Sequence, residues 1–289
     1  MKLSAAFDTR IGGRRRNEDA AAVTAAGAAL LAVVADGMGG HNHGDVASRL
    51  AVETLIQAFQ AQVTAAAPRL ADPFLFLQQG FEAGHRALAD FTREQRLPES
   101  PLTTCVACLL QDGIAYWAHV GDSRLYLLRD GRIHARTRDH SYVQQLLDRG
   151  EISPAQALQH PQRNRVSTCL GGPLPPATEF SRKTPVQPGD VLALCTDGVW
   201  NVLAAGELAD ILLSNPAAAA VKTSLDRVDQ RGGERRDNLT LAVIRCEGEP
   251  AATAVPAAPE PTPAEPSPAP DDLGATLAAL RRKLQAADD

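Results

Sequence analysis

Four acidic motifs of this sequence border apolar runs that are typical of β-strands. The motifs are Asn17-Glu18-Asp19, Asp36-Gly37, Asp197-Gly198 and Asp237-Asn238. Adjacent antiparallel strands can bring such ends together, so these carboxylates can meet at one rim of a sheet. Gathered there, they repel one another unless cations neutralise them. Mg²⁺ and Mn²⁺ prefer carboxylate, carbonyl and water oxygens, so the pattern favours a site for hard divalent cations.

A glycine follows two of these aspartates, Asp36 and Asp197. Glycine lets the backbone turn sharply, which can bring a carbonyl oxygen to a metal. Taken alone, an Asp-Gly pair is more typical of an ordinary turn than of a ligand. Four acidic motifs at strand ends favour a metal site more strongly, and the flanking sequence decides between the two interpretations.

The elements that must position these acids are short apolar strands separated by turns. The predicted strands are 30–35, 103–110, 114–120, 124–129, 191–195 and 239–245. The tight turn Gly121-Asp122-Ser123 predicts a β-hairpin, and Asp112-Gly113 and Asp130-Gly131 predict further turns. Helical patterns cover residues 45–61, 73–94, 205–213 and 216–230. Strands grouped in this way, with paired helices between the groups, predict an α+β layered sandwich.

The composition fits a globular protein with an acidic balance. The chain has 289 residues, 44% of them hydrophobic and 4% aromatic, so its core must be mainly aliphatic. The net charge of −5 argues against a nucleic-acid-coating protein. The sequence has no apolar run of membrane-spanning length and no signal-peptide core, so we expect no membrane association. Its five scattered cysteines are expected to be reduced core residues of a cytoplasmic protein.

A change of composition sets the C-terminal part apart. Residues 249–270 contain eight prolines, which predicts an extended linker. Residues 271–289 carry leucines in a 4-3-4 spacing, which predicts a short amphipathic helix. That helix could dock a partner or pair with another copy of itself, and a solvated tail is the alternative. We therefore predict a domain over residues 1–248, a linker and a helical tail.

Six ordered motifs carry a family resemblance. They are 14–19 (RRRNED), 33–48 (VVADGMGGHNHGDVAS), 103–104 (TT), 120–124 (VGDSR), 188–199 (PGDVLALCTDGV) and 237–240 (DNLT). This series resembles the PPM-type, metal-dependent Ser/Thr protein phosphatases (the protein phosphatase 2C family), and its second motif resembles their bacterial branch. Residues 140–172, with His160 and Asn164, resemble the flap of bacterial members. The resemblance covers residues 1 to about 246 and implies a four-layer αββα sandwich, with two central antiparallel sheets flanked by helices.

The resemblance also implies an activity and a set of site residues. The activity is hydrolysis of phosphoserine and phosphothreonine on proteins by a water that two Mn²⁺ or Mg²⁺ ions activate. Arg14 would bind the substrate phosphate, whose oxygens suit a planar guanidinium. The implied metal ligands are Glu18, Asp19, Asp36, Gly37, Asp122, Asp197 and Asp237. Arg14, Asp36 and Asp197 are the expected catalytic residues.

The family pattern gives these ligands separate roles. Asp36 would bridge the two metals, and the Gly37 carbonyl would hold the first. Asp197 and Asp237 would hold the second, while Glu18 and Asp19 would act directly or through waters. Asp122 would share a third, weaker metal with Asp197.

One position departs from the pattern of many eukaryotic members. They carry a histidine directly after the Asp-Gly pair, proposed there as the general acid, whereas this chain has Met38. His41 and His43 lie close in sequence, although solvent-facing loop histidines are the more typical interpretation. A water on a metal could serve instead.

The sequence is also compatible with functions of other classes. A phosphoprotein-binding scaffold without strong catalysis, recruited through its C-terminal helix, is the main alternative. A two-metal nuclease conflicts with the acidic balance and with the ordered motifs. The pair Cys105 and Cys108 is better explained by core packing than by redox or zinc chemistry, because side chains three apart in a strand face opposite sides. Bacterial relatives commonly oppose a Ser/Thr kinase, some of them in type VI secretion clusters, so such a kinase and its substrates are the expected partners.

Overall fold

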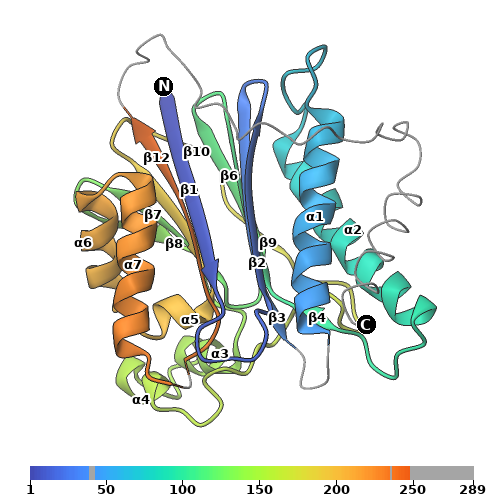
Figure 1. The fold of residues 1–289 in the computed structure, drawn as a ribbon, viewed down its shortest axis with the longest axis vertical. Helices are drawn as coiled ribbons and strands as arrows, with labels where there is room; N and C mark the ends of the chain where they lie inside the picture. The colour runs from blue at the N-terminus through green and yellow to red at the C-terminus, as the bar shows by residue number, and fades with distance from the viewer. Residues whose placement is uncertain (39–42, 235, 248–289) are drawn as a thin grey trace. The chain divides into compact units, whose positions relative to one another are not determined.

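Two antiparallel β-sheets lie face to face between two layers of helices, as Figure 1 shows. The computed structural model describes residues 1–38, 43–234 and 236–247. The predicted linker 249–270 and helical tail 271–289 lie outside the described residues, as do His41 and residue 248. The four-layer α+β sandwich implied by the sequence motifs is confirmed.

The first sheet has five strands in the order β1-β12-β11-β7-β8. Its strands are β1 (Lys2–Arg10), β12 (Leu239–Glu247), β11 (Val191–Cys195), β7 (Arg124–Arg129) and β8 (Arg132–Arg136). The helices α6 (Ala205–Ser214) and α7 (Ala217–Arg231) cover its outer face (Figure 1). A cluster of buried Leu, Val, Ala and Ile side chains joins these helices to the sheet. The short helix α5 (Asp197–Trp200) begins just after β11.

The second sheet has seven strands, with β10-β6-β5-β3-β2 as its main path. Its strands are β2 (Asp19–Ala26), β3 (Ala29–Met38), β4 (Leu102–Thr103), β5 (Cys105–Gln111), β6 (Ile114–Val120), β9 (Glu179–Phe180) and β10 (Thr184–Pro185). The helices α1 (Gly44–Gln62) and α2 (Pro73–Glu94) lie on its outer side (Figure 1). Asp72 caps α2 by accepting hydrogen bonds from the Phe74 and Leu75 amides, and Pro73 occupies the first turn. A proline is tolerated there because its missing N–H has no partner within the helix.

Between the two sheets lies a core of aliphatic side chains with two cysteines. Cys108 of β5 points into this core, whereas Cys105, an odd number of residues away, is buried outside it. Burial raises the pKa of both thiols, which keeps them protonated. Their side chains face opposite sides of one strand, as predicted. No disulfide joins any of the five cysteines, all of which fall within the described ranges.

The segment from 140 to 172, predicted as a flap, connects the two sheets. It contains the short helices α3 (Tyr142–Asp148) and α4 (Pro154–Leu158), each capped by a serine side chain. An isolated bridge between Ser141 and Val166 closes the segment on itself. A second bridge, between Thr103 and Leu170, fastens its end to the edge of β4. The flap role remains a prediction.

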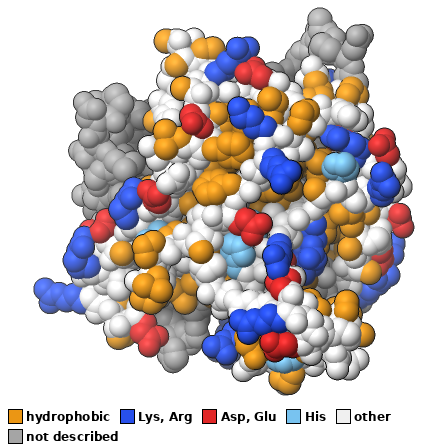
Figure 2. Space-filling view, turned by 180° about the vertical axis from the view of Figure 1, so that it is seen from behind, with side chains coloured by type: hydrophobic (Ala, Val, Ile, Leu, Met, Phe, Trp, Pro, Cys, Tyr) orange, Lys and Arg blue, Asp and Glu red, His pale blue; other side chains and the backbone are white. Residues whose placement is uncertain are grey.

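The face turned away from the viewer in Figure 1 carries mixed charges. Figure 2 shows basic and acidic side chains interspersed there, with apolar patches between them. Within residues 1–38, 43–234 and 236–247, no helix is both long and apolar enough to cross a membrane.

The predicted hairpin at Gly121-Asp122-Ser123 was wrong. The turn passes from β6 in the seven-stranded sheet to β7 in the five-stranded sheet. The flanking strands pair elsewhere: β6 with β5 through the Asp112-Gly113 turn, and β7 with β8 through Asp130-Gly131. A tight turn fixes how sharply the chain bends, but the pairing partners depend on which apolar faces are free. The turn therefore joins the two sheets at the rim where the acidic motifs lie.

Gly121 is required at this crossing by its backbone and by its neighbours. Its φ is +97°, and a Cβ there would lie 2.5 Å from Cγ2 of Thr104. Gly131 has a similar φ of +75° with nothing within 4 Å of its would-be Cβ. A side chain would therefore cause backbone strain at both positions, but only at Gly121 would it also collide with a neighbour.

We predict that Gly121→Ala lowers the free energy of unfolding by about 2–4 kcal/mol, because backbone strain adds to overpacking. Gly131→Ala, the matched control, should cost only about 1 kcal/mol of strain. Urea unfolding of both variants measures the difference. Equal losses in the two variants would show that the contact with Thr104 does not constrain the turn.

Candidate metal centre

A cavity of about 800 Å³ opens at the rim where the acidic motifs meet. The predicted site residues that line it are Arg14, Glu18, Asp36, Gly37, Asp122, Asp197 and Asp237. They come from the ends of β3 and β6, from the start of α5 and from loops next to β2 and β12. The structure therefore brings together residues that are up to 223 positions apart in the chain.

Asp36 and Asp19 lie opposite each other on paired strands. The register of β2 against β3 aligns Asp19 with Asp36. Two threonines hold the backbone of Asp36: its N–H donates to Oγ1 of Thr104 over 3.1 Å, and its carbonyl accepts from Oγ1 of Thr103 over 2.9 Å. These bonds fix the end of β3 from the side of β4 and β5.

Asp19 lies behind the cavity and does not line it. Its Oδ2 accepts hydrogen bonds from the hydroxyls of Thr196, over 2.8 Å, and Thr240, over 2.7 Å. Because Thr240 donates to Asp19, it must accept from the Thr9 hydroxyl, 2.8 Å away. The Asn17 amide in turn donates to Thr9. Asp19 is thus buried within a polar chain that joins β1, β2, β11 and β12.

Gly37 occupies a place where no side chain fits. A Cβ there would lie 2.0 Å from the carbonyl oxygen of Gly44 and 2.6 Å from that of Glu18. The Gly37 N–H donates to the Glu18 carbonyl over 2.9 Å. The absent side chain lets three backbone segments converge at the cavity wall.

Asn238 joins the loop after β1 to the start of β12. Its amide donates to the carbonyls of Ile11 and Arg16, and its Oδ1 accepts from the N–H of Glu18 over 2.8 Å. The preceding residue, Asp237, is thereby placed beside Glu18 and Arg14. This one side chain therefore sets the geometry of the whole N-terminal acidic motif.

Arg14 reaches across the cavity mouth to Asp237. Its Nη2 lies 2.7 Å from Oδ2 of Asp237, and the arginine side chain is 56% exposed. The hydrogen bond to Asp237 raises the pKa of the Arg14 guanidinium. An exposed ion pair of this kind is weak, so an incoming phosphate can compete for the guanidinium.

Asp122 is buried in the turn between the sheets. Its carbonyl accepts from Nε1 of Trp200 over 3.0 Å. The guanidinium of Arg124 lies over the Trp200 ring, 3.6 Å from its centre, and makes a two-point ion pair with Asp139. The turn is thereby held by α5 and by the segment that precedes α3.

Burial raises the pKa of several carboxyl groups here, and the other acids add to the effect. The pKa rises to about 7 for Asp19, about 8 for Asp122 and about 6 for Asp197. Asp36 has its pKa raised well above the usual range, by burial and then by the charge of Asp19. Burial also raises the pKa of Glu18, and Asp45 adds to the rise. The site is a concentration of negative charge whose ionised form needs positive charge nearby.

Further residues that the sequence motifs did not assign also line the cavity. Asn164 and Val166 reach it from the flap segment, while Arg15 and Arg16 add basic charge beside Arg14. The only signal for Asn164 was its place in the flap resemblance. The threonines that hold Asp19 and Asp36 all lie within the family motifs, but the sequence analysis assigned them no role.

Of the two histidines considered as a general acid, only His43 lies among the described residues. Met38 lines it, as the family pattern of bacterial members implied. His43 does not line it and instead packs edge-on against Phe91, with 5.8 Å between ring centres. None of the described residues that line the cavity is a histidine.

Comparison with known proteins identifies the family. Residues 8–241 match the family described as "Protein phosphatase 2C". The chain belongs to the protein phosphatase 2C family. It is 33% identical over 217 residues to the serine/threonine phosphatase stp of Listeria welshimeri, covering 74% of this chain and 83% of that protein. The chain is accordingly a protein serine/threonine phosphatase.

Solved structures agree with the family. The Mycobacterium tuberculosis serine/threonine phosphatase PstP/Ppp matches with a TM-score of 0.74 and 31% identity, covering 85% of this chain and 99% of that one. A PstP catalytic domain in complex with two manganese ions matches with a TM-score of 0.71 and 30% identity, covering 84% and 97%. PppA, described as a key regulatory component of T6SS in Pseudomonas aeruginosa, matches with a TM-score of 0.71 and 33% identity, covering 85% and 98%.

The raised pKa values predict how pH acts on the metal-free phosphatase. Carboxyls whose folded-state pKa exceeds the unfolded value of 3.8 bind more protons in the folded state, so stability falls as pH rises. With EDTA present, the Tm should fall between about pH 4 and pH 8, the window that these pKa values span.

Asp36→Asn removes one of the titrating groups and should flatten the fall in Tm. Asp210→Asn, an exposed change on α6, is the control and should leave the slope unchanged. Thermal denaturation across the pH range measures all three proteins. A Tm that rises with pH over this window in EDTA would contradict the charge balance described for the site.

Proposed function

We propose that the acid-lined cavity is the phosphatase active site and holds Mn²⁺ or Mg²⁺. The observation that carries the proposal is the convergence of Asp36, Asp197 and Asp237 on one cavity with Arg14 at its mouth. The donors are carboxylate and carbonyl oxygens, which suit these hard cations. The two manganese ions of the similar PstP structure support the same assignment.

The proposed ligand roles follow the family pattern. Asp36 would be the ligand shared by two cations, and the Gly37 carbonyl would contribute to holding the first. Asp197 and Asp237 would hold the second, and Glu18, which lines the same cavity, would act directly or through water. Asp19, behind the cavity, would act through water, and Asp122 would help Asp197 hold a third and weaker cation.

When bound, such cations neutralise the clustered charge and lower the pKa of a water that attacks phosphorus. The residues of this chain then position the substrate. Arg14 exchanges Asp237 for the phosphate oxygens, which its planar guanidinium can bind with two hydrogen bonds. Arg15 and Arg16 add positive charge for a dianionic phosphate ester. The Thr103 and Thr104 hydrogen bonds keep Asp36 fixed while charge changes in the cavity.

We further propose that the enzyme works in the cytoplasm on the products of a Ser/Thr protein kinase, without forming a phosphoenzyme intermediate. The five free cysteines support a reducing compartment. The likeness to PppA, described as a key regulatory component of T6SS, supports a regulatory role in a secretion-linked pathway. Nothing in the described residues favours the catalytically weak scaffold, because every predicted acid is present at or beside the cavity.

We predict that Asp36→Asn reduces kcat by at least about 100-fold at any Mn²⁺ concentration, because it removes the proposed bridge between the cations. Hydrolysis of a phosphothreonine peptide measures the loss. Asp210→Asn is again the matched surface control and should retain full activity. Near-normal turnover by Asp36→Asn would refute the proposed metal centre.

The predicted tail gives a second test. We propose that residues 271–289, predicted as an amphipathic helix beyond the linker 249–270, dock a partner protein. The chain should be cut after Glu247, since β12 pairs with β1 up to that residue. The shortened protein should keep full activity on a small phosphopeptide and lose activity on the intact kinase.

A double change in the predicted tail, Leu277→Glu with Leu280→Glu, should mimic the loss, because it charges the apolar face of the predicted helix. Exchanging Lys283 for Gln on the same segment is the control. Equal rates for full-length and shortened protein on the intact kinase would contradict the proposal that the tail docks a partner.

A further inference from the structure

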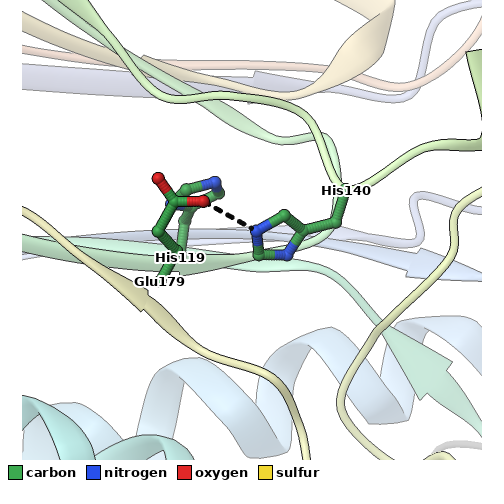
Figure 3. A group of neighbouring side chains, drawn as sticks. All are labelled: His119, His140 and Glu179. Carbon is green, nitrogen blue, oxygen red and sulfur yellow. Dashed lines mark hydrogen bonds and ion pairs between the residues drawn. The ribbon is translucent and has the colours of Figure 1, made fainter. Parts of the chain in front are cut away.

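Two histidines and a glutamate meet outside the proposed active centre (Figure 3). They are His119 of β6, His140 just before α3, and Glu179 of β9. The pairing of β9 with β6 sets Glu179 directly opposite His119. One ligand atom from each of the three side chains lies within 4.8 Å of the other two. None of them is among the predicted metal ligands.

One ring nitrogen of His119 is left as an acceptor by the hydrogen bond that the other makes. The residue is 2% exposed, and its Nε2 lies 2.7 Å from the carbonyl oxygen of Arg138. That bond makes Nε2 the donor and leaves Nδ1 as the acceptor. Burial lowers the pKa of His119, which keeps the ring neutral. A backbone carbonyl bound to the second ring nitrogen is the usual support of a metal-binding histidine.

His140 and Glu179 are already spaced as neighbouring ligands. Nε2 of His140 lies 3.3 Å from Oε2 of Glu179. Two ligands of a tetrahedral zinc ion are about 3.3 Å apart when the bonds are about 2.0–2.1 Å long. The rings of His119 and His140 stack, with centres 4.5 Å apart and planes at 28°. Rotation of the exposed Glu179 side chain and of His140 would complete the convergence.

The charge around the cluster favours a cation. Asp139 is paired with Arg124, and Asp148 is paired with Arg138, so these charges cancel. Glu179 remains as the unbalanced charge beside two imidazoles.

The cluster opens to a cavity of its own. This cavity, of about 430 Å³, is lined by His140 and Glu179 together with residues of the flap segment. It shares no lining residue with the acid-lined cavity. An ion from solvent can therefore reach His140 and Glu179 without passing the active site, while His119 lies behind them and does not line this cavity.

We propose that His119, His140 and Glu179 form a second metal site, which binds a transition ion of the zinc class. Two imidazole nitrogens and one carboxylate are a ligand set of zinc, with the fourth position open to water from the cavity. Imidazole donors select against Mg²⁺, so the two sites take different ions. The bound ion joins β6, β9 and the base of the flap segment.

Binding at this site alters the turn that carries Asp122. The Gly121 N–H donates to Nδ1 of His140 over 3.3 Å. When Nε2 of His140 binds the ion, its proton moves to Nδ1, which can then no longer accept from Gly121. Binding of the ion therefore removes the hydrogen bond between Gly121 and His140. Because Gly121 precedes Asp122, this change links the proposed zinc site to the proposed active site.

The test uses Co²⁺ as a visible probe of nitrogen-rich tetrahedral sites. Full-length protein with Mg²⁺ in excess is titrated with Co²⁺, and its visible absorption is recorded before and after addition of Zn²⁺. We expect one equivalent of Co²⁺ to give an intense band that Zn²⁺ abolishes. Glu179→Gln and His140→Gln should each weaken Co²⁺ binding at least about tenfold.

Two further variants separate this site from other histidines and from the active centre. His134→Gln removes an exposed histidine of β8 and should leave the band unchanged. Asp36→Asn, which disables the proposed active centre, should leave it unchanged as well. Absence of the band in the unaltered protein, or titrations of Glu179→Gln and His140→Gln that match it, would overturn the proposal.

Discussion

The mutual repulsion of buried carboxylates is the constraint on which the rest of this structure depends. Asp36, Asp122 and Asp197 are held at one rim although burial raises the pKa of each. A chain free to relax would move such charges apart. Here the backbone does not allow it, because Thr103, Thr104 and Asn238 fix the strand ends through hydrogen bonds. The repulsion between these carboxylates therefore favours the binding of any cation that neutralises them.

The stiffness behind this rim comes from the aliphatic core between the sheets. Small and medium side chains such as Ala32, Leu127 and Ala242 fill that layer, and they are fully buried. Close-packed interiors transmit displacements instead of absorbing them. The polar chain from Asn17 to Asp19 lies directly at the rim of this layer, where it joins strands of both sheets. Two kinds of interaction therefore hold the acids in place. They are the apolar packing between the sheets and the hydrogen bonds at the rim.

Most of the fold could be predicted because its strands are short apolar runs with glycine turns. The helices 45–61 and 73–94 were predicted to within a residue or two of α1 and α2. The turn at Gly121 was misassigned, since a local pattern says nothing about which sheet receives the next strand. β1 was also missed: its residues alternate poorly, and it is a strand because β12 pairs along its length.

The acids of the candidate site could be predicted from the sequence, whereas the side chains that hold them by hydrogen bonds could not. Aspartates beside glycine at strand ends are visible in a sequence, whereas Thr196 and Thr240 become meaningful only when their strands lie side by side. The cluster of His119 and Glu179 was even less predictable from the sequence. Glu179 lies in a two-residue strand with no apolar signature, so its position opposite His119 depends wholly on tertiary structure.

The pairing of β1 with β12 has a consequence for how the protein is made. Lys2 lies opposite Glu247, so the first strand waits for the last before its ladder can close. At a synthesis rate of about 5–20 residues per second, that wait is on the order of 10–50 s. During it, the nascent chain exposes an unpaired strand, which Asp8 and Arg10 protect with charge against aggregation. The same delay leaves the nascent chain without Asp237, so under the proposed metal assignment a newly made molecule would not act on phosphoproteins until translation of the domain is almost finished.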